Sequence, residues 1–168
     1  NLGAYAEGRH PTTDDYQFGG GGGMVLKPEP LFAAVEALRT PGARVILTDP
    51  RGRRFTQEVA TELTQVAHLI LLAGRYEGVD ERVGARLADE MISIGDYVLT
   101  GGELPALVIA DAVIRLRAEY LLAARCPERI VFDFTSGHPA RWLDWSAGLR
   151  PVVSGTQVSW QPRSAADS

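Results

Sequence analysis

The sequence predicts an α/β fold, built as a parallel sheet with helices on both faces. Three short, mostly apolar runs, at residues 44–47, 68–73 and 91–94, are predicted to be strands, and the run at 68–73 has the continuous apolar character of a buried parallel strand. Helical patterns separate these runs, and parallel strands are joined by right-handed crossovers of this kind. Loops rich in glycine and acidic residues lie between them. Because ligands bind beyond the carboxyl ends of such strands, we expect a site there.

The first helix is predicted to begin at Pro30, because proline suits the first helical position. Leu31, Val35 and Leu38 recur at helical spacing and form one apolar face. The Thr-Pro-Gly sequence at 40–42 ends this helix, which therefore leads directly into the first predicted strand.

Three further helices are predicted from their starts and their apolar spacing. Thr56 and Asp80 are each placed to cap a helix, since both side chains accept hydrogen bonds from backbone N–H groups. Pro105 begins a helix that stays apolar on nearly all sides through Leu116, so we expect it to be buried. The apolar faces of the two capped helices consist of Val59, Leu63 and Val66, and of Val83, Leu87 and Met91.

Composition indicates one globular domain with room for a small appendage. The chain has 168 residues, of which 45% are hydrophobic and 23% charged, and its net charge is −4. No apolar run approaches the roughly 20 residues that span a bilayer. Cys126 is the single cysteine, which excludes an internal disulfide and a cysteine-rich zinc site. A chain without disulfides fits a reducing compartment, so we expect a cytoplasmic protein.

Two features leave alternatives open. The run Gly19–Gly23 is either a flexible linker or a loop whose amide groups meet a polar ligand. Arginines gather at 51–54 and again at 115–129. They are either solvated or paired side chains, or parts of a basic face that holds RNA. The fingerprints of nucleoside-triphosphate and dinucleotide sites are absent from the sequence.

Three loops occupy the ligand-binding position of a parallel sheet: 48–52, 74–78 and 95–105. Their glycines allow a ligand to approach the backbone closely, while tyrosine and acidic side chains supply polar groups. Convergence of the loops predicts one small-molecule pocket. The alternative is that the glycines serve only tight turns.

Two long motifs carry a resemblance to a known family. Residues 74–82 read Gly-Arg-Tyr-Glu-Gly-Val-Asp-Glu-Arg, and residues 93–105 read Ser-Ile-Gly-Asp-Tyr-Val-Leu-Thr-Gly-Gly-Glu-Leu-Pro. Upstream, Asp14-Asp15 precedes a glycine run that ends before Met24. In this order and spacing, from about residue 10 to residue 115, the chain resembles the bacterial tRNA (guanine-N1)-methyltransferases of the trefoil-knotted SPOUT superfamily.

The resemblance implies transfer of a methyl group from S-adenosylmethionine to N1 of the guanine at tRNA position 37, next to the anticodon. It also implies a trefoil knot, tRNA as partner, a homodimer, no DNA or membrane partner, and Mg²⁺ as a candidate ion. One alternative is a methyltransferase of the same superfamily that acts on another RNA site. Another is a non-catalytic module that holds the donor or RNA.

By resemblance, the three loops hold the methyl donor mostly through backbone groups, and Tyr76 and Leu99 supply apolar walls. Glu77 resembles a family acid associated with the methionine end of the donor and with the divalent ion; the alternative is that it caps the following turn. The donor-binding residues implied in this chain are Leu47, Thr48, Pro50, Gly52, Gly74, Tyr76, Glu77, Gly78, Ile94, Gly95, Tyr97, Val98, Leu99, Gly101, Gly102 and Pro105.

Catalysis requires two further groups. Guanine N1 carries a proton, so a base that removes it eases attack on the methyl group. Negative charge then grows toward the neighbouring carbonyl oxygen, where an arginine donor helps. Arg115 falls at the family position of such an arginine; the alternative is an exposed helix arginine. No motif identifies the base, and Asp133 is the nearest acid.

The resemblance also divides the chain. Residues 1–118 are expected to form the knotted donor-binding domain, without the family's first strand. Residues 119–168 are expected to be a divergent tail, the remnant of a small helical C-terminal domain. Within it Trp142 and Trp145 stand three residues apart, so we expect them to share a helix face.

Overall fold

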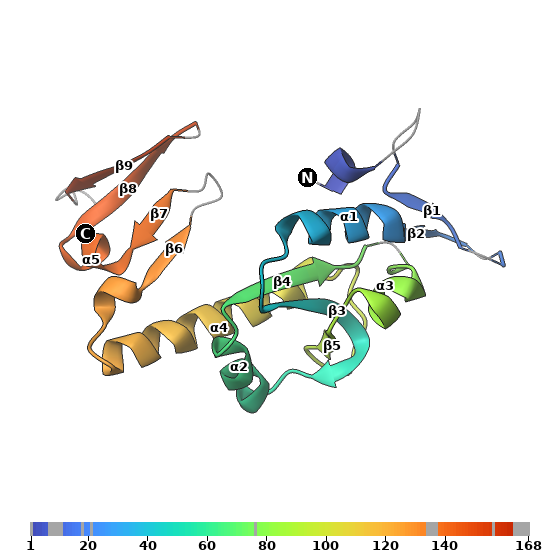
Figure 1. The fold of residues 1–168 in the computed structure, drawn as a ribbon, viewed down its shortest axis with the longest axis horizontal. Helices are drawn as coiled ribbons and strands as arrows, with labels where there is room; N and C mark the ends of the chain where they lie inside the picture. The colour runs from blue at the N-terminus through green and yellow to red at the C-terminus, as the bar shows by residue number, and fades with distance from the viewer. Residues whose placement is uncertain are drawn as a thin grey trace. The chain divides into compact units, whose positions relative to one another are not determined.

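The computed structural model describes residues 2–6, 12–17, 19–20, 22–75, 77–133, 138–155 and 157–162. The chain divides into two units, Asn1–Ile114 and Arg115–Ser168, whose elements are labelled in Figure 1. Helix α4, Glu103–Ala123, begins in the first unit and continues into the second. The other elements of the first unit are η1 (Leu2–Tyr5), β1 (Asp14–Tyr16), β2 (Met24–Leu26), α1 (Pro28–Leu38), β3 (Ala43–Arg54), α2 (Gln57–Thr64), β4 (His68–Ala73), α3 (Glu81–Arg86) and β5 (Glu90–Ser93).

A parallel sheet in the order β4-β3-β5 forms the centre of the first unit. The pairing of β3 with β4 runs from Ala43 opposite His68 to Thr48 opposite Ala73. On its other side β3 pairs with β5, starting with Ile46 opposite Glu90. The three apolar runs in the sequence lie in these three strands, which confirms the predicted α/β organisation.

Side chains of β3 alternate between two hydrophobic clusters. Val45 and Leu47 belong to the first cluster and Ile46 to the second, and each is no more than 1% exposed. Helices α1 and α3 contribute to the first cluster, and α2 and α4 to the second, so helices cover both faces of the sheet. The first cluster contains Leu26, Leu31, Val35, Val45, Leu47, Ile70, Leu72, Val83 and Leu87, and the second contains Ile46, Val59, Leu63, Ile92, Ile109 and Val113.

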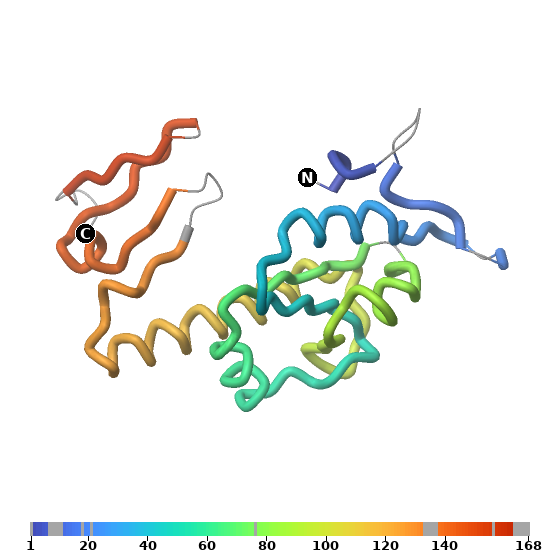
Figure 2. Tube along the Cα trace, viewed as in Figure 1, coloured from blue at the N-terminus to red at the C-terminus, as the bar shows by residue number. Residues whose placement is uncertain are grey.

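The structure corrects the predicted end of the first strand. We expected the strand to stop before a loop at 48–52, but β3 continues to Arg54. The ladder with β5 is irregular there, because Ile92 pairs with Thr48 and again with Arg53. The intervening segment bulges out of the ladder, and Figure 2 shows the strong bend of the chain along β3.

Two residues explain why the strand bulges and then resumes. Pro50 has no N–H group to donate within a central strand, so it is suited to such an irregularity. Beyond it, Gly52 lies against β5, where an added Cβ would be only 2.5 Å from the backbone nitrogen of Ile92. The absence of a side chain at Gly52 therefore allows β3 to rejoin β5.

The predicted caps of two helices are confirmed. The Thr56 side chain accepts a hydrogen bond from Val59 N at 3.4 Å at the start of α2. At the start of α3, the Asp80 carboxylate accepts one from Arg82 N at 2.9 Å. Both side chains satisfy backbone groups that lack a partner within the helix.

Helices α1 and α3 differ from their predicted extents. α1 begins at Pro28 rather than Pro30, because the first of the two prolines already fits the opening turn. Its Leu38 is 56% exposed and lies outside the apolar face. α3 ends at Arg86, and Met91 lies in β5, where it packs on the first cluster from the sheet instead of the helix.

Helix α4 is not buried on all sides, contrary to expectation. It is 21 residues long and begins at Glu103. Of its apolar residues, Ile109 and Val113 join the second cluster. Others in the first unit are exposed and lie together at helical spacing; we call them the apolar face of α4. This face consists of Leu104, Leu107, Val108 and Ile114.

The second unit has more strand than the expected helical remnant. Two antiparallel hairpins pair β6 (Val131–Asp133) with β7 (Pro139–Arg141), and β8 (Leu149–Ser154) with β9 (Gln157–Pro162). Short helical pieces are η2 (Pro127–Arg129) and α5 (Trp142–Ser146). The sequence of these residues lacks sustained helical periodicity, and successive strands pair with one another in hairpins instead.

An aromatic contact joins α5 to the second hairpin. The rings of Trp145 and Trp160 meet edge to face with centroids 5.8 Å apart. The Arg150 guanidinium lies 4.9 Å from the Trp145 ring centroid, within the range of a cation–π contact. Trp142 and Trp145 both lie on α5, as expected, and Trp145 anchors that helix against the hairpin.

We predict that Leu63→Ala lowers the free energy of unfolding by about 2 to 5 kcal/mol, the range for a buried leucine truncation. Leu63 is 1% exposed in the second cluster, so the change leaves a cavity. Thr61→Ala on the exposed side of α2 is the matched control and should change it by less than about 0.5 kcal/mol. Denaturant unfolding measures both; equal effects would contradict the assigned core.

Candidate functional site

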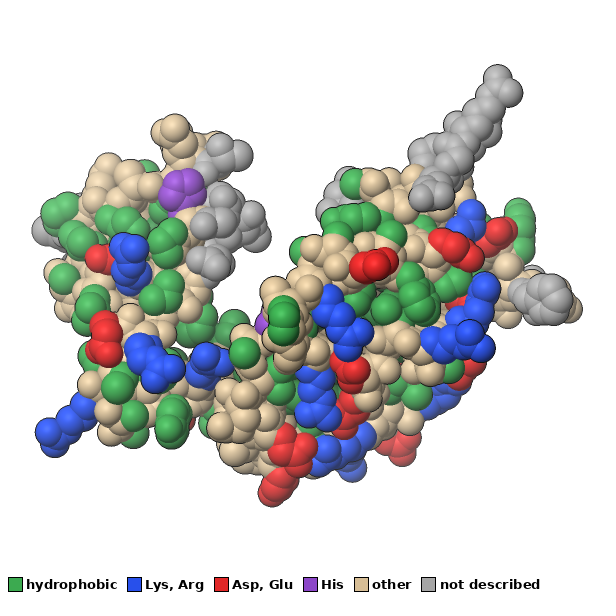
Figure 3. Space-filling model, viewed as in Figure 1, with side chains coloured by type: hydrophobic (Ala, Val, Ile, Leu, Met, Phe, Trp, Pro, Cys, Tyr) green, Lys and Arg blue, Asp and Glu red, His purple; other side chains and the backbone are tan. Residues whose placement is uncertain are grey.

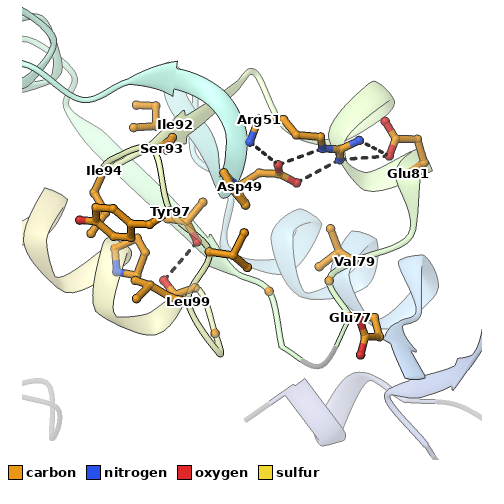
Figure 4. A pocket seen from close by; sticks show the side chains of 18 residues that line it. Asp49, Arg51, Glu77, Val79, Glu81, Ile92, Ser93, Ile94, Tyr97 and Leu99 are labelled. Atoms are coloured by element: carbon orange, nitrogen blue, oxygen red, sulfur yellow. Dashed lines mark hydrogen bonds and ion pairs between the residues drawn. The ribbon is translucent and has the colours of Figure 1, made fainter. Parts of the chain in front are cut away.

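A cavity of about 400 Å³ lies in the first unit, at the carboxyl ends of the sheet strands. Its volume is within the range of small-molecule sites. Residues from β3, from the loops after β4 and β5, and from the start of α4 line it, and Figure 4 shows their side chains. The expected donor-binding residues that line the cavity are Thr48, Pro50, Gly74, Glu77, Gly78, Ile94, Tyr97, Val98, Leu99, Gly101, Gly102 and Pro105.

Leu47, Gly52 and Gly95 are not among the described residues that line the cavity. Leu47 is 1% exposed and belongs to the first cluster, because alternation along β3 turns it into the core. Gly52 packs against the backbone of β5 instead of facing the cavity. Gly95 lies next to the Tyr97 ring. Tyr76 lies outside the described residues.

Several lining residues were not expected from the sequence: Asp49, Arg51, Val79, Glu81, Ile92 and Ser93. Asp49 and Arg51 flank Pro50 in the bulge of β3. They lie within the loop expected at 48–52, but neither was among the residues expected to bind the donor. Glu81 is the first residue of α3, shortly after the second loop. The sequence therefore indicated a ligand site near Glu81, but it did not indicate that Glu81 itself lines the cavity.

The three loops meet at Gly102. The Thr48 hydroxyl lies 3.1 Å from both the Leu72 and the Gly102 carbonyl oxygens and donates toward them. Gly102 N donates to Gly74 O at 2.7 Å. A Cβ on Gly102 would collide with the Thr48 hydroxyl and lie 2.7 Å from Gly74 N and 2.9 Å from Ala73 Cα. This meeting point therefore has no space for a side chain.

An ion pair reinforces the contact between the second and third loops. The Arg75 guanidinium bonds to the Glu103 carboxylate, and Arg75 also forms a backbone bridge with Gly101. The hydrogen bond from Arg75 holds the pKa of Glu103 below its usual value. Glu103 therefore stays ionised at neutral pH, at the first turn of α4, where a negative charge is favourable.

One wall of the cavity is charged. Arg51 bonds to the Asp49 carboxylate through Nε at 3.0 Å and through Nη2 at 3.0 Å. Its two Nη atoms also lie 3.2 Å from Glu81 Oε2. The Arg51 hydrogen bond lowers the pKa of Asp49, against the opposing effect of burial. Figure 4 shows these three side chains together on one side of the cavity.

Glu77 is positioned by the hairpin of β1 and β2. Its backbone N donates to Met24 O at 3.0 Å, and Leu26 N donates to Gly78 O at 3.1 Å, so β2 runs beside the second loop. Gly23 has a φ of +91°, and a Cβ there would lie 2.9 Å from Glu77 Oε1. The described end of the glycine run therefore packs on a cavity residue, which a simple linker would not do. Gly21 lies outside the described residues.

The opposite wall is apolar. Ile94, Tyr97 and Leu99 lie there in the loop after β5, and Figure 4 shows them across the cavity from Arg51. Tyr97 is 55% exposed and Val98 is 80% exposed. The cavity thus combines an apolar wall suited to a flat aromatic group with a charged wall suited to a polar one.

The expected catalytic residues are not among those that line the cavity. Arg115 lies on α4, and its side chain, 77% exposed, bonds to Glu119 with an N–O distance of 2.9 Å. Asp133 ends β6, and its side chain lies outside the described part of the structure. Both positions belong to the second unit, whereas the cavity lies in the first.

In the described part of the chain, no three or more His, Cys, Asp or Glu side chains gather to hold a metal ion. The described residues around Glu77 therefore supply no such group of three side chains. None of the helices in the described ranges combines the length and apolarity needed to cross a bilayer.

We predict that Gly102→Ala lowers the free energy of unfolding by about 1 to 3 kcal/mol or more, as overpacking does. The new methyl group would press on backbone atoms of the second loop, which cannot move aside locally. Gly101→Ala is the matched control, because its methyl group would meet mainly the flexible Glu103 carboxylate. Thermal or denaturant unfolding that ranks the control as equally damaging would contradict this assignment.

Comparison with known proteins places the chain in a family. The family model of the tRNA (Guanine-1)-methyltransferase TrmD matches residues 1–128. A second model, a domain of unknown function (4846), matches residues 89–168.

Curated relatives agree with the first model. The chain is 59% identical over 116 residues to the tRNA (guanine-N(1)-)-methyltransferase of Dictyoglomus turgidum, an alignment that covers 69% of the chain and 47% of the relative. It is 57% identical over 114 residues to the same enzyme of Geobacillus kaustophilus, covering 67% and 47%. For Bacillus subtilis the identity is 54% over 119 residues, covering 69% and 49%.

The chain spans about half the length of the curated relatives it matches. The matched part includes the whole cavity, since the cavity residues lie between Thr48 and Pro105. With more than half of its residues covered by the family model, the chain belongs to the tRNA (guanine-1)-methyltransferase family.

Proposed function

We propose that the chain transfers a methyl group from S-adenosylmethionine to N1 of the guanine at tRNA position 37. The observation that carries this proposal is the cavity, in which loops from three strand ends combine an apolar and a charged wall. The names of the curated relatives describe the same reaction class. We also propose the SPOUT trefoil knot, with residues 1–118 as the donor-binding domain and 119–168 as a separate tail.

The cavity suits the donor at both ends. An adenine packs on apolar side chains such as Ile94 and Leu99 while its edge meets backbone groups of the third loop. A zwitterionic methionine end needs charged partners, which Arg51 and Glu77 supply. The donor, when bound, supplies the electrophilic methyl group. Four lining residues have no side chain, which allows the ligand to approach the loop backbone closely: Gly74, Gly78, Gly101 and Gly102.

The remaining steps concern the guanine. A base must take the N1 proton, and a cationic donor must stabilise the charge that grows on the carbonyl oxygen. We propose Arg115 for the second role, by its position after the apolar part of α4. We assign no residue to the base, and no step through a metal ion, because the described residues do not form a metal site.

We further propose that the active form is a homodimer that uses the apolar face of α4. Leu107 in this face is 65% exposed and Leu104 is 61% exposed. Tyr97 and Val98, in the loop before the helix, add to the exposed apolar surface of the same unit. Exposed apolar side chains gathered on one helix face are typical of an interaction site, and a second copy of the chain would cover them.

The test of the reaction is an assay with labelled S-adenosylmethionine and unmodified tRNA transcripts that carry guanine or adenine at position 37. Labelling of the guanine transcript alone supports the proposal. Labelling of both transcripts would indicate another RNA site. Donor binding without labelling of either would indicate a non-catalytic donor-binding module.

If the chain is active, Arg115→Ala should lower the single-turnover rate by about 100-fold, the effect of losing one transition-state donor. Its donor affinity should stay unchanged, since the charge it stabilises forms only during reaction. Arg117→Ala on the same helix is the matched control. Parallel losses of rate and affinity would make Arg115 a structural residue.

For the homodimer, sedimentation at micromolar concentration should give a dimer for the wild type. Leu107→Glu should shift it toward monomer, because a buried unpaired charge is costly at an interface. Leu38→Glu places the same charge on another exposed leucine, in α1, and should leave the dimer intact. A monomeric wild type would count against the proposal.

A further inference from the structure

The charged wall of the cavity contains one cation among the described lining residues, and this is Arg51. The acids Asp49, Glu77 and Glu81 line the same cavity. A ligand that carries a carboxylate meets repulsion from these acids unless it reaches Arg51. The position of this carboxylate is therefore strongly restricted by a single side chain.

Two other arginines in the neighbouring loop and helix do not replace it. Arg75 bonds to Glu103 and ties the second loop to the third. Arg82 bonds to Asp80 at 2.8 and 2.9 Å, in the cap of α3. Neither lines the cavity.

Asp49 holds the Arg51 guanidinium in a defined orientation. Its two carboxylate oxygens accept hydrogen bonds from Arg51 Nε and Nη2. The same carboxylate also accepts a hydrogen bond from the Arg51 backbone N at 2.8 Å. The Asp49 side chain is only 15% exposed, whereas the Arg51 side chain is 60% exposed, so the carboxylate is shielded and the guanidinium is accessible. The side-on geometry leaves the Nη1 and Nη2 edge of Arg51 directed at a second anion.

That second anion is Glu81, and its ion pair with Arg51 is weak. Its side chain is 71% exposed, and it reaches both Nη atoms through a single oxygen, Oε2. Exposed ion pairs of this kind contribute little to stability, so another carboxylate can replace Glu81 at small cost. Glu81 belongs to the first turn of α3 and has solvent to move into.

We propose that Arg51 binds the carboxylate at the methionine end of S-adenosylmethionine, which replaces Glu81 on the Nη edge. This inference rests on the proposed donor binding and adds the residue that selects the amino-acid tail. Asp49 acts through Arg51 as a positioning residue. Glu81 is a competitor that occupies the edge until the ligand carboxylate displaces it.

Titration calorimetry of the full chain with S-adenosylmethionine and with its decarboxylated analogue tests the proposal. The analogue keeps the sulfonium and the ammonium and lacks only the carboxylate. The wild type should prefer the full donor by about 10- to 100-fold, the range of a hydrogen bond to a charged group. Arg51→Gln should lose this preference, while Arg54→Gln, an exposed arginine at the end of the same strand, should retain it.

Glu81→Gln should change the affinity for the full donor in the opposite direction from Arg51→Gln. Removal of the competing carboxylate should tighten binding of the full donor about two- to fivefold and leave the decarboxylated analogue unchanged. A merely structural role of the cluster would weaken both ligands in both variants. Unfolding curves that match the wild type show that the variants remain folded.

The outcomes separate this inference from the function on which it rests. Failure of the wild type to bind either ligand overturns donor binding itself. Binding with equal affinity for both ligands, a preference that persists in Arg51→Gln, or weaker donor binding in Glu81→Gln overturns the role of Arg51 alone.

Discussion

The geometry of the site depends on one place where backbone meets backbone, at Gly102. There the Thr48 hydroxyl holds the ends of β3 and β4 and the third loop together, by donating toward the Leu72 and Gly102 carbonyl oxygens. Gly102 N donates to Gly74 O from the same position. Because a side chain would separate these segments, the positions of all three loops follow from its absence. The cavity is therefore held by one backbone hydrogen bond and by the Thr48 hydroxyl, both of which need the close approach that Gly102 allows.

The charged wall depends on a second constraint, in β3. A regular strand would continue its ladder with β5 and turn alternate side chains into the two clusters. Pro50 cannot donate to that ladder, and the segment around it leaves the sheet before the strand resumes at Arg53. Asp49 and Arg51 reach the cavity because of this bulge. One local irregularity thus converts strand positions that would pack in a core into positions that face a ligand.

Much of the fold was predictable from the sequence because its signals are local. The apolar runs identify the strands, and Thr56 and Asp80 identify helix starts, since both act within three residues. The convergence of the loops followed from the general geometry of parallel sheets. By contrast, the bulge of β3 depends on its pairing with Ile92, far along the chain, and no local pattern specifies it. The contact of Arg51 with Glu81 joins two such distant segments and was equally invisible.

The same reasoning explains why α4 was expected to be buried and is not. A helix that is apolar nearly all round has the same sequence pattern whether it is covered by the core of its own domain or by another chain. In the structure, the side of α4 that carries Ile109 and Val113 packs in the second cluster with residues of the sheet. Leu104 and Leu107 then face outward, although they follow directly from the loop that lines the cavity. A partner that covers this face would restrain the start of α4 and, through Gly102, the loops that form the site.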